Sequence, residues 1–268
     1  MPQNSIVSIV MAAGRGSRMK GYDGNKTLLP LIPEESPCQG SMPILVHILK
    51  AIPEGPKAVI VNHRKNDIIR ATECLNVTYC EQPQLNGTGG AVLAARSFLE
   101  NTACENVLIT MGDVPLVQPE TYHRLVENLA DNALVILGFC PEDKKQYGVL
   151  ELENDRVERI TEWKYWRSYP AETRAALSVC NAGIYAVRRD ALLQYLSVLE
   201  ATPQTVVKEI NGKCVEIQEF FITDLIEHMV NDGLSIGYVI ADDPIETMGV
   251  DDMAALSAAQ AVFREKYD

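Results

Sequence analysis

The sequence predicts an α/β fold, with a mixed, mostly parallel central sheet and helices on both of its faces. Short apolar runs alternate with helix-like stretches through the first half of the chain. This pattern is typical of parallel strands whose connecting helices cover both sides of a sheet. The chain has 268 residues, 47% of them hydrophobic, which is enough for the core of one large domain. After residue 140 the strand candidates follow one another more closely, so we expect a more mixed second half.

Apolar periodicity and turn residues place each element in order. In the first half we expect strands at 5–13, 57–62, 76–80, 106–113 and 133–139. The helices expected between them lie at 43–52, 66–75, 89–99 and 119–130. In the second half we expect a hairpin of strands at 147–154 and 156–163, strands at 180–189 and 234–241, and helices at 190–199, 222–230 and 251–268. Asp251 or Asp252 is the expected N-cap of the last helix.

Composition excludes several classes of protein. A net charge of −12 argues against a general nucleic-acid binder, which usually carries a basic surface. Seven cysteines, an odd number with no CxxC pair, predict neither a disulfide framework nor a zinc site. The first residues do not show the basic segment followed by a long apolar segment that is typical of a secretory leader, and no apolar run approaches the length needed to span a bilayer. We therefore expect a cytoplasmic protein with reduced thiols and no membrane partner.

The stretch MAAGRGSRM at 11–19 follows the first predicted strand and indicates an anion site. Gly14 and Gly16 allow main-chain N–H groups to approach a phosphate, and Arg15 and Arg18 can neutralise its charge. The alternative is a tight strand-to-helix turn with surface arginines, because short glycine motifs recur widely. The later GYDGNKT is not a P-loop, because Asn25 separates the glycine from the lysine.

Two further stretches lie where predicted strands end. Asp113, in GDVPL at 112–116, can reach a cation, although an aspartate before a proline can also simply bond its own turn. In QPQLNGTGGA at 82–91, Gly87 and Thr88 lead into a predicted helix whose free N–H groups favour an anion or a base edge, and Thr88 could equally be an ordinary N-cap. Ligands bind at the carboxyl ends of parallel strands, so we expect 11–19, 81–88 and 112–116 to share one rim of the sheet.

Together and in this order, these motifs resemble those of the sugar-phosphate nucleotidyltransferases, above all the uridylyltransferase domain that makes UDP-N-acetylglucosamine. The resemblance spans almost the whole chain. It rests on MAAGRGSRM (11–19), Lys26 in NKTLLPL, QPQLNGTGGA (82–91), GDVPL (112–116), Tyr147-Gly148, ITE (160–162), NAGIY (181–185), EFFITD (219–224) and GVDD (249–252). It implies a Rossmann-like nucleotide-diphospho-sugar transferase fold over residues 1–250, with 251–268 as a C-terminal helix packed on it or extending from it.

The resemblance also implies a role for each matching residue. Catalytic contacts to the triphosphate and the attacked α-phosphate fall to Arg18 and Lys26. Nucleotide binding falls to Ala12, Ala13, Gly14, Gly16, Gln82, Gly87 and Thr88, with Gln82 at the uracil edge. Sugar binding falls to Gly148, Glu162, Asn181 and Thr223. Mg²⁺ falls to Asp113 and Asp251.

The implied reaction is Mg²⁺-dependent transfer of a uridylyl group from UTP to N-acetylglucosamine 1-phosphate, with release of pyrophosphate. Such chemistry needs positioning and charge stabilisation rather than a protein nucleophile. Two alternatives stay open: an enzyme of the same fold that uses another sugar 1-phosphate or nucleoside triphosphate, and a catalytically silent nucleotide-binding module. Related proteins often continue into a β-helix acetyltransferase domain, and we expect no acetyltransferase activity from these residues.

The sequence departs from the family pattern at several positions. Asn25 stands for a proline before the lysine, Met111 for an aromatic residue, and Gly-Thr-Gly-Gly for Gly-Thr-Gly-His. Asp251 stands where close relatives have asparagine, which strengthens the metal assignment, and Phe221 replaces a tyrosine, which removes one hydroxyl near the sugar. Trp163 and Trp166 could line the sugar pocket or pack in the core.

Overall fold

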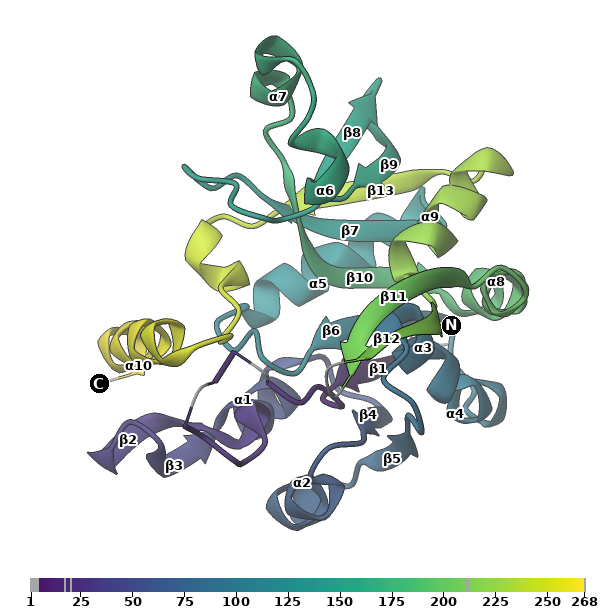
Figure 1. Cartoon of the computed structure of the whole chain (residues 1–268). Helices are drawn as coiled ribbons and strands as arrows, with labels where there is room; N and C mark the ends of the chain where they lie inside the picture. Colours follow the sequence, from purple (N-terminus) through teal and green to yellow (C-terminus); the bar gives the residue numbers. More distant parts are fainter. Residues whose placement is uncertain (1–4, 17, 20, 211–212, 268) are drawn as a thin grey trace.

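The structure is a computed structural model that describes residues 5–16, 18–19, 21–210 and 213–267. Its centre is a nine-stranded mixed sheet with the order β13-β7-β10-β6-β1-β4-β5, to which β8 and β9 add a hairpin beside β10 (Figure 1). The strands are β1 (Ile6–Met11), β4 (Lys57–Val61), β5 (Thr78–Glu81), β6 (Asn106–Met111), β7 (Leu134–Phe139), β8 (Val149–Glu153), β9 (Arg156–Thr161), β10 (Cys180–Arg188) and β13 (Ile236–Ile240). The predicted mixed, mostly parallel sheet with helices on both faces is confirmed.

Strand direction explains how the sheet is mixed. β1 pairs in parallel with β4 and β6, β4 with β5, and β7 with β13. β10 lies between β6 and β7 and runs antiparallel to both. Its first residues therefore lie at the edge where β6 and β7 end, which brings a late part of the chain to the rim where the sequence predicts a site.

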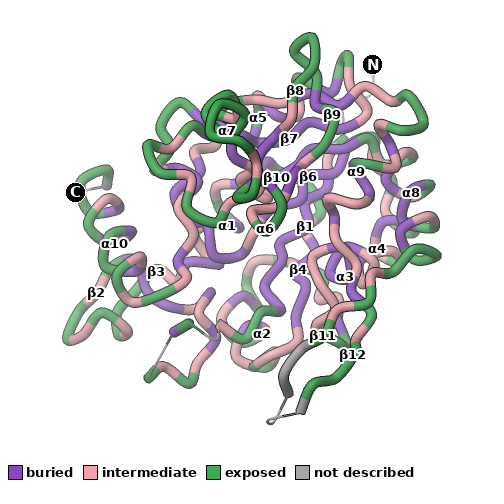
Figure 2. The backbone as a smooth tube through the Cα atoms, turned by 45° about the horizontal axis from the view of Figure 1, so that its top comes forward, coloured by how far each residue is buried: buried purple, intermediate pink, exposed green. Residues whose placement is uncertain are grey.

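Helices cover both faces of this sheet. They are α1 (Ile44–Ala51), α2 (Lys65–Thr72), α3 (Gly87–Ala94), α4 (Arg96–Asn101), α5 (Pro119–Glu127), α6 (Trp163–Trp166), α7 (Ala171–Ala176), α8 (Arg189–Ala201), α9 (Ile222–Asn231) and α10 (Met253–Tyr267). Adjacent strand residues point to opposite faces, so Ile9 and Ile109 pack against α3, α8 and α9, whereas Val10 and Leu108 pack in the layer of α1, α5 and α10. Figure 2 shows the central strands as the most continuously buried part of the chain.

Several expected elements differ in detail from the structure. The helix predicted at 89–99 is two helices, because the chain bends at Ala95 between α3 and α4. The strand predicted to reach residue 13 ends at Met11, and the one predicted to reach 163 ends at Thr161. Two hairpins were not predicted: β2 (Pro30–Ser36) with β3 (Gln39–Pro43), and β11 (Gln204–Ile210) with β12 (Lys213–Glu219). None of the helices among the described residues has the length and apolar character to cross a bilayer.

The last helix, α10, packs against the β2–β3 hairpin. Its Gln260 is buried and donates from Nε2 to the carbonyl oxygens of Pro30 and Pro37, both at 2.8 Å. Of the two expected N-caps, the structure selects Asp252, whose Oδ1 accepts from the Ala255 N–H at 2.9 Å. The side chain of Asp251 therefore does not cap α10.

We expect Gln260→Leu to lower the free energy of unfolding by about 2 kcal/mol, because it removes both hydrogen bonds of a buried carboxamide and leaves the carbonyl oxygen of the buried Pro30 without this donor. Urea unfolding followed by circular dichroism measures the change. Ser257→Ala, at an exposed position of the same helix, is the matched control and should stay close to wild type. Equal stabilities of Gln260→Leu and wild type would show that the hydrogen bonds from Gln260 to the β2–β3 hairpin do not stabilise the fold.

Candidate functional site

A cavity of about 650 Å³ opens at the carboxyl ends of β1 and β6, a size typical of small-molecule sites. The three stretches that the sequence places at one rim all contribute to its wall, together with the start of β10 and residues 219–223. Of the predicted site residues, those that line it are Ala12, Ala13, Gly14, Gly16, Arg18, Lys26, Gln82, Gly87, Thr88, Asp113, Glu162, Asn181, Thr223 and Asp251. Gly148 lies just behind the wall, where its carbonyl oxygen accepts from the Asn181 N–H at 2.8 Å.

The glycine loop after β1 is shaped by a neighbouring side chain, that of Lys26. Gly16 has φ of +61°, and a Cβ there would lie 3.3 Å from the Lys26 side chain. Asn25, the departure from the expected proline, is 1% exposed and caps a short 3-10 helix (Lys26–Leu28) by accepting from the Thr27 N–H. Its Nδ2 donates to the carbonyl oxygen of His63 at 3.0 Å and to that of Ala12 at 3.4 Å. Asn25 thus ties the lysine segment to the glycine loop.

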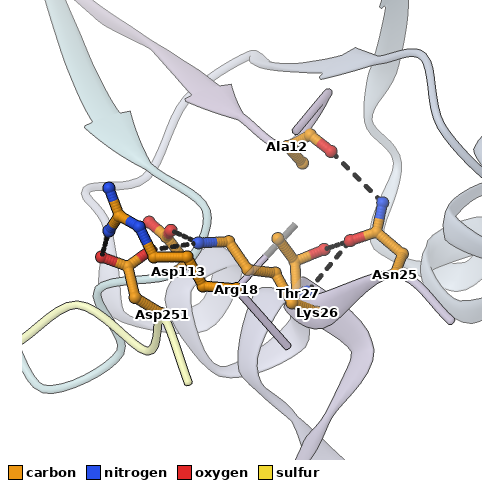
Figure 3. A network of polar contacts seen from close by, with 7 residues as sticks. All are labelled: Ala12, Arg18, Asn25, Lys26, Thr27, Asp113 and Asp251. Atoms are coloured by element: carbon orange, nitrogen blue, oxygen red, sulfur yellow. Dashed lines mark hydrogen bonds and ion pairs between the residues drawn. The ribbon is translucent and has the colours of Figure 1, made fainter. Parts of the chain in front are cut away.

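The Lys26 ammonium lies between two carboxylates from distant parts of the chain (Figure 3). It forms ion pairs with Asp113, which follows β6, and with Asp251, at 2.8 Å from Oδ1. Arg18 pairs with the other oxygen of Asp251, also at 2.8 Å. The Lys26 and Asp113 side chains are only 11% and 12% exposed, whereas Arg18 is 71% exposed. The sequence left open whether Asp113 only bonds its own turn, and the structure instead pairs it with Lys26.

Electrostatic interactions favour the charged forms of Lys26 and Asp251. Burial lowers the pKa of Lys26, but the two carboxylates raise it more, and the net pKa lies above its ordinary value. Burial raises the pKa of Asp251, but Lys26 and then Arg18 lower it further, so that the net pKa lies below its ordinary value. Asp113 and Asp251 are the groups that could hold a cation beside the phosphate-binding loop, and the same lysine could contact an anion there.

At the opposite end of the cavity, Gln82 is 3% exposed and its carboxamide is fixed. Nε2 donates to Asn86 Oδ1 at 2.9 Å and to the carbonyl oxygen of Gly87 at 3.1 Å. The interpretation of Thr88 as an N-cap is wrong: Asn86 holds that position, and the Thr88 hydroxyl inside the first turn accepts from the Ile222 N–H at 3.3 Å. The start of α3 is thereby joined to the segment that begins α9.

Of the predicted sugar-binding residues, Glu162, Asn181 and Thr223 line the wall. Asn181 donates from Nδ2 to the Tyr185 hydroxyl at 2.9 Å, and its Oδ1 accepts from the Gly183 N–H at 2.9 Å. Burial raises the pKa of Glu162, Lys164 lowers it and Asp224 raises it, with a net increase. No described residue donates a hydrogen bond to the Glu162 carboxylate, which leaves it available as an acceptor in the cavity wall.

The excursion of the chain between Glu162 and Asn181 contains the two tryptophans. Trp166 is 6% exposed, packs in the core and donates from Nε1 to the carbonyl oxygen of Tyr147 at 2.9 Å. Neither Trp163 nor Trp166 is among the described residues that line the cavity. Core packing, one of the two interpretations of these residues, is therefore the one that the structure supports.

Other lining residues were not assigned a role from the sequence. Some lie inside the motifs that carry the resemblance, where the motif indicated the segment but not the side chain; these are Met11, Thr27, Val114, Tyr147, Ala182, Gly183, Tyr185, Glu219, Phe221, Ile222 and Gly249. Leu85 and Ala91 lie in the 82–91 motif in the same way. Met111 and Thr247 also line the wall, and both lie outside these motifs.

A glycine loop, a buried lysine and a carboxylate pair at the rim of a mixed α/β sheet are typical of nucleotidyl-transferring enzymes. The chain belongs to the family of MobA-like NTP transferase domains, whose family model matches residues 8–207.

Individual relatives agree with this family. The bifunctional protein GlmU of Ruegeria pomeroyi is 31% identical over 267 residues, which cover 98% of this chain and 53% of that protein; the chain thus spans about half the length of the curated relatives it matches. The UDP-N-acetylglucosamine pyrophosphorylase of Trypanosoma brucei has a TM-score of 0.72 at 14% identity, covering 96% of this chain and 65% of that one. A nucleotidyl transferase of Methanothermobacter thermautotroptrophicus has a TM-score of 0.63 at 20% identity, covering 98% and 100%. The two structures show the fold.

We expect Glu162→Gln to raise the melting temperature at pH 7, because a half-buried carboxylate with a raised pKa costs free energy when ionised. That cost disappears as the pH falls below the unfolded-state pKa of about 4.3, so the variant and wild type should converge near pH 4. Differential scanning fluorimetry from pH 4 to 8 measures this, with the exposed Glu153→Gln as control. A gap that persists unchanged at pH 4 would contradict the ionisation argument.

Proposed function

We propose that this protein transfers a uridylyl group from UTP to N-acetylglucosamine 1-phosphate in a Mg²⁺-dependent reaction that releases pyrophosphate. The observation that carries the proposal is the Lys26 ammonium between Asp113 and Asp251, beside the glycine loop. Family membership supports nucleotidyl transfer. The motif resemblance supports the particular nucleotide and sugar.

The donor set at the carboxylate pair suits Mg²⁺. The described residues gather no group of three or more His, Cys, Asp or Glu side chains that could hold a metal. Two carboxylates that leave the remaining positions to phosphate oxygens and water are the usual protein contribution to a magnesium site. Such an ion would neutralise charge on the reacting phosphates. Arg18 and Lys26 would hold the triphosphate so that an oxygen of the sugar phosphate attacks the α-phosphorus in line with the departing pyrophosphate.

The geometry of Gln82 supports uracil. Both hydrogens of its amide nitrogen are taken by Asn86 and Gly87, so its oxygen is the atom left to meet a base. Uracil presents a ring N–H donor at this edge, whereas the corresponding nitrogen of cytosine is an acceptor. A cytidylyltransferase of the same fold is therefore the weaker alternative.

The sugar end supports a polar, hydroxyl-rich ligand. Glu162 offers an acceptor and Asn181 is held in a fixed orientation by Tyr185 and Gly183. Phe221, in the wall where the family pattern has tyrosine, supplies only an apolar ring. Another sugar 1-phosphate is the principal alternative for this part of the proposal.

The test of the whole proposal is pyrophosphate release with Mg²⁺ across a grid of nucleoside triphosphates and sugar 1-phosphates. We expect release with UTP and N-acetylglucosamine 1-phosphate above all other pairs. Release with a different pair would mean that this pair, and not UTP with N-acetylglucosamine 1-phosphate, is the substrate pair. No release with any pair would favour a catalytically silent nucleotide-binding module.

We expect Asp113→Asn to reduce pyrophosphate release by on the order of 100-fold or more, because the site loses one of its two charged metal ligands. Folding should change little, since Lys26 keeps its pair with Asp251. A coupled pyrophosphate assay and a melting curve measure the two effects. Asp131→Asn, at an exposed position away from the cavity, is the control. Undiminished turnover of Asp113→Asn would overturn the metal assignment.

A further inference from the structure

Resting on the proposed function, we propose that Asn86 is a positioning residue that fixes which end of the Gln82 carboxamide faces the nucleobase. It would thereby set the preference for a pyrimidine with a ring N–H. Asn86 is not among the described residues that line the cavity, so it acts through Gln82 and not by touching the nucleotide.

A glutamine carboxamide has two ends of similar size and opposite hydrogen-bonding character. If Gln82 turned its amide over, its NH₂ group would face the cavity and would match the ring acceptor of cytosine. The turned amide would also direct Oε1 at two acceptors, Asn86 Oδ1 and the Gly87 carbonyl oxygen, which now receive Nε2 at 2.9 and 3.1 Å. The Gly87 main-chain oxygen can only accept, and Asn86 Oδ1, in its present orientation, is a second acceptor on the same side. The two together favour the orientation of Gln82 in which Nε2 points at them and Oε1 meets the base.

Asn86 is itself held in place. Its carbonyl oxygen accepts from the Phe220 N–H at 2.9 Å, and its own N–H donates to the Gln84 carbonyl oxygen at 2.9 Å. Its side chain fills the space above Gly90, where a Cβ would overlap Oδ1. The glycine at position 90 is therefore a steric requirement of this arrangement: a larger residue there would push the Asn86 carboxamide away from Gln82.

The experiment compares equilibrium binding of UTP and CTP by isothermal titration calorimetry in wild type, Asn86→Ala, Asn86→Asp and Gly90→Ala. We expect the ratio of the two dissociation constants to fall about five-fold in Asn86→Ala, the effect of one net hydrogen bond. Asn86→Asp keeps an acceptor for Nε2 and should retain the wild-type ratio. Gly90→Ala should behave like Asn86→Ala although it leaves Asn86 in the chain.

A purely structural role for Asn86 would weaken both nucleotides equally, so the ratio separates positioning from loss of structure. A wild-type ratio in both Asn86→Ala and Gly90→Ala, or an equal fall in Asn86→Asp and Asn86→Ala, would overturn the inference. Wild-type protein that binds CTP as tightly as UTP would contradict the proposed base choice and the inference with it. A selective wild type whose ratio survives every substitution would leave the proposed function standing and remove only the role of Asn86.

Discussion

The reversed direction of β10 is the constraint on which the site depends. In a purely parallel sheet, the rim at which β1 and β6 end would receive only the loops that leave these strands. Because β10 runs antiparallel between β6 and β7, the chain enters it at this same rim, and Asn181 and Gly183 lie opposite the glycine loop. The antiparallel direction of β10 therefore adds its first residues to the cavity wall, beside the loops that follow β1 and β6.

Charge balance orders the middle of this cavity. Lys26 and Arg18 come from the loop after β1, whereas Asp113 and Asp251 come from segments 138 residues apart in the sequence. The pairs are largely sheltered from solvent on the Lys26–Asp113 side and exposed on the Arg18 side. A sheltered ion pair has a fixed geometry, because the loss of either partner would leave an uncompensated buried charge. The exposed arginine is the member of the group that can adapt to a ligand at little cost.

The sequence was sufficient to predict the buried strands and most of the helices, because long Val- and Ile-rich runs such as 106–111 leave few alternatives. The two hairpins were missed because their residues alternate irregularly; β2, for example, holds two prolines and is buried only at its start. Of the residues to which the motif resemblance assigned a role, all but Gly148 line the cavity. The motifs could not show that Asn86 bonds Gln82 or that Asn25 braces the glycine loop, because spacing along a chain does not define where a side chain points.

The start of α3 is bonded to the segment that leads into α9. The Gly89 N–H donates to the Phe220 carbonyl oxygen at 2.8 Å, and a Cβ at Gly87 or Gly89 would collide with the Phe220 main chain. The walls that we propose for the base and for the sugar therefore share one stretch of contacting backbone. A descendant of this protein could not lengthen or reshape residues 219–223 to admit a new sugar without also disturbing base recognition. Its evolution toward other acceptors is confined to exchanging side chains, such as that of Phe221, on a backbone that must keep its path.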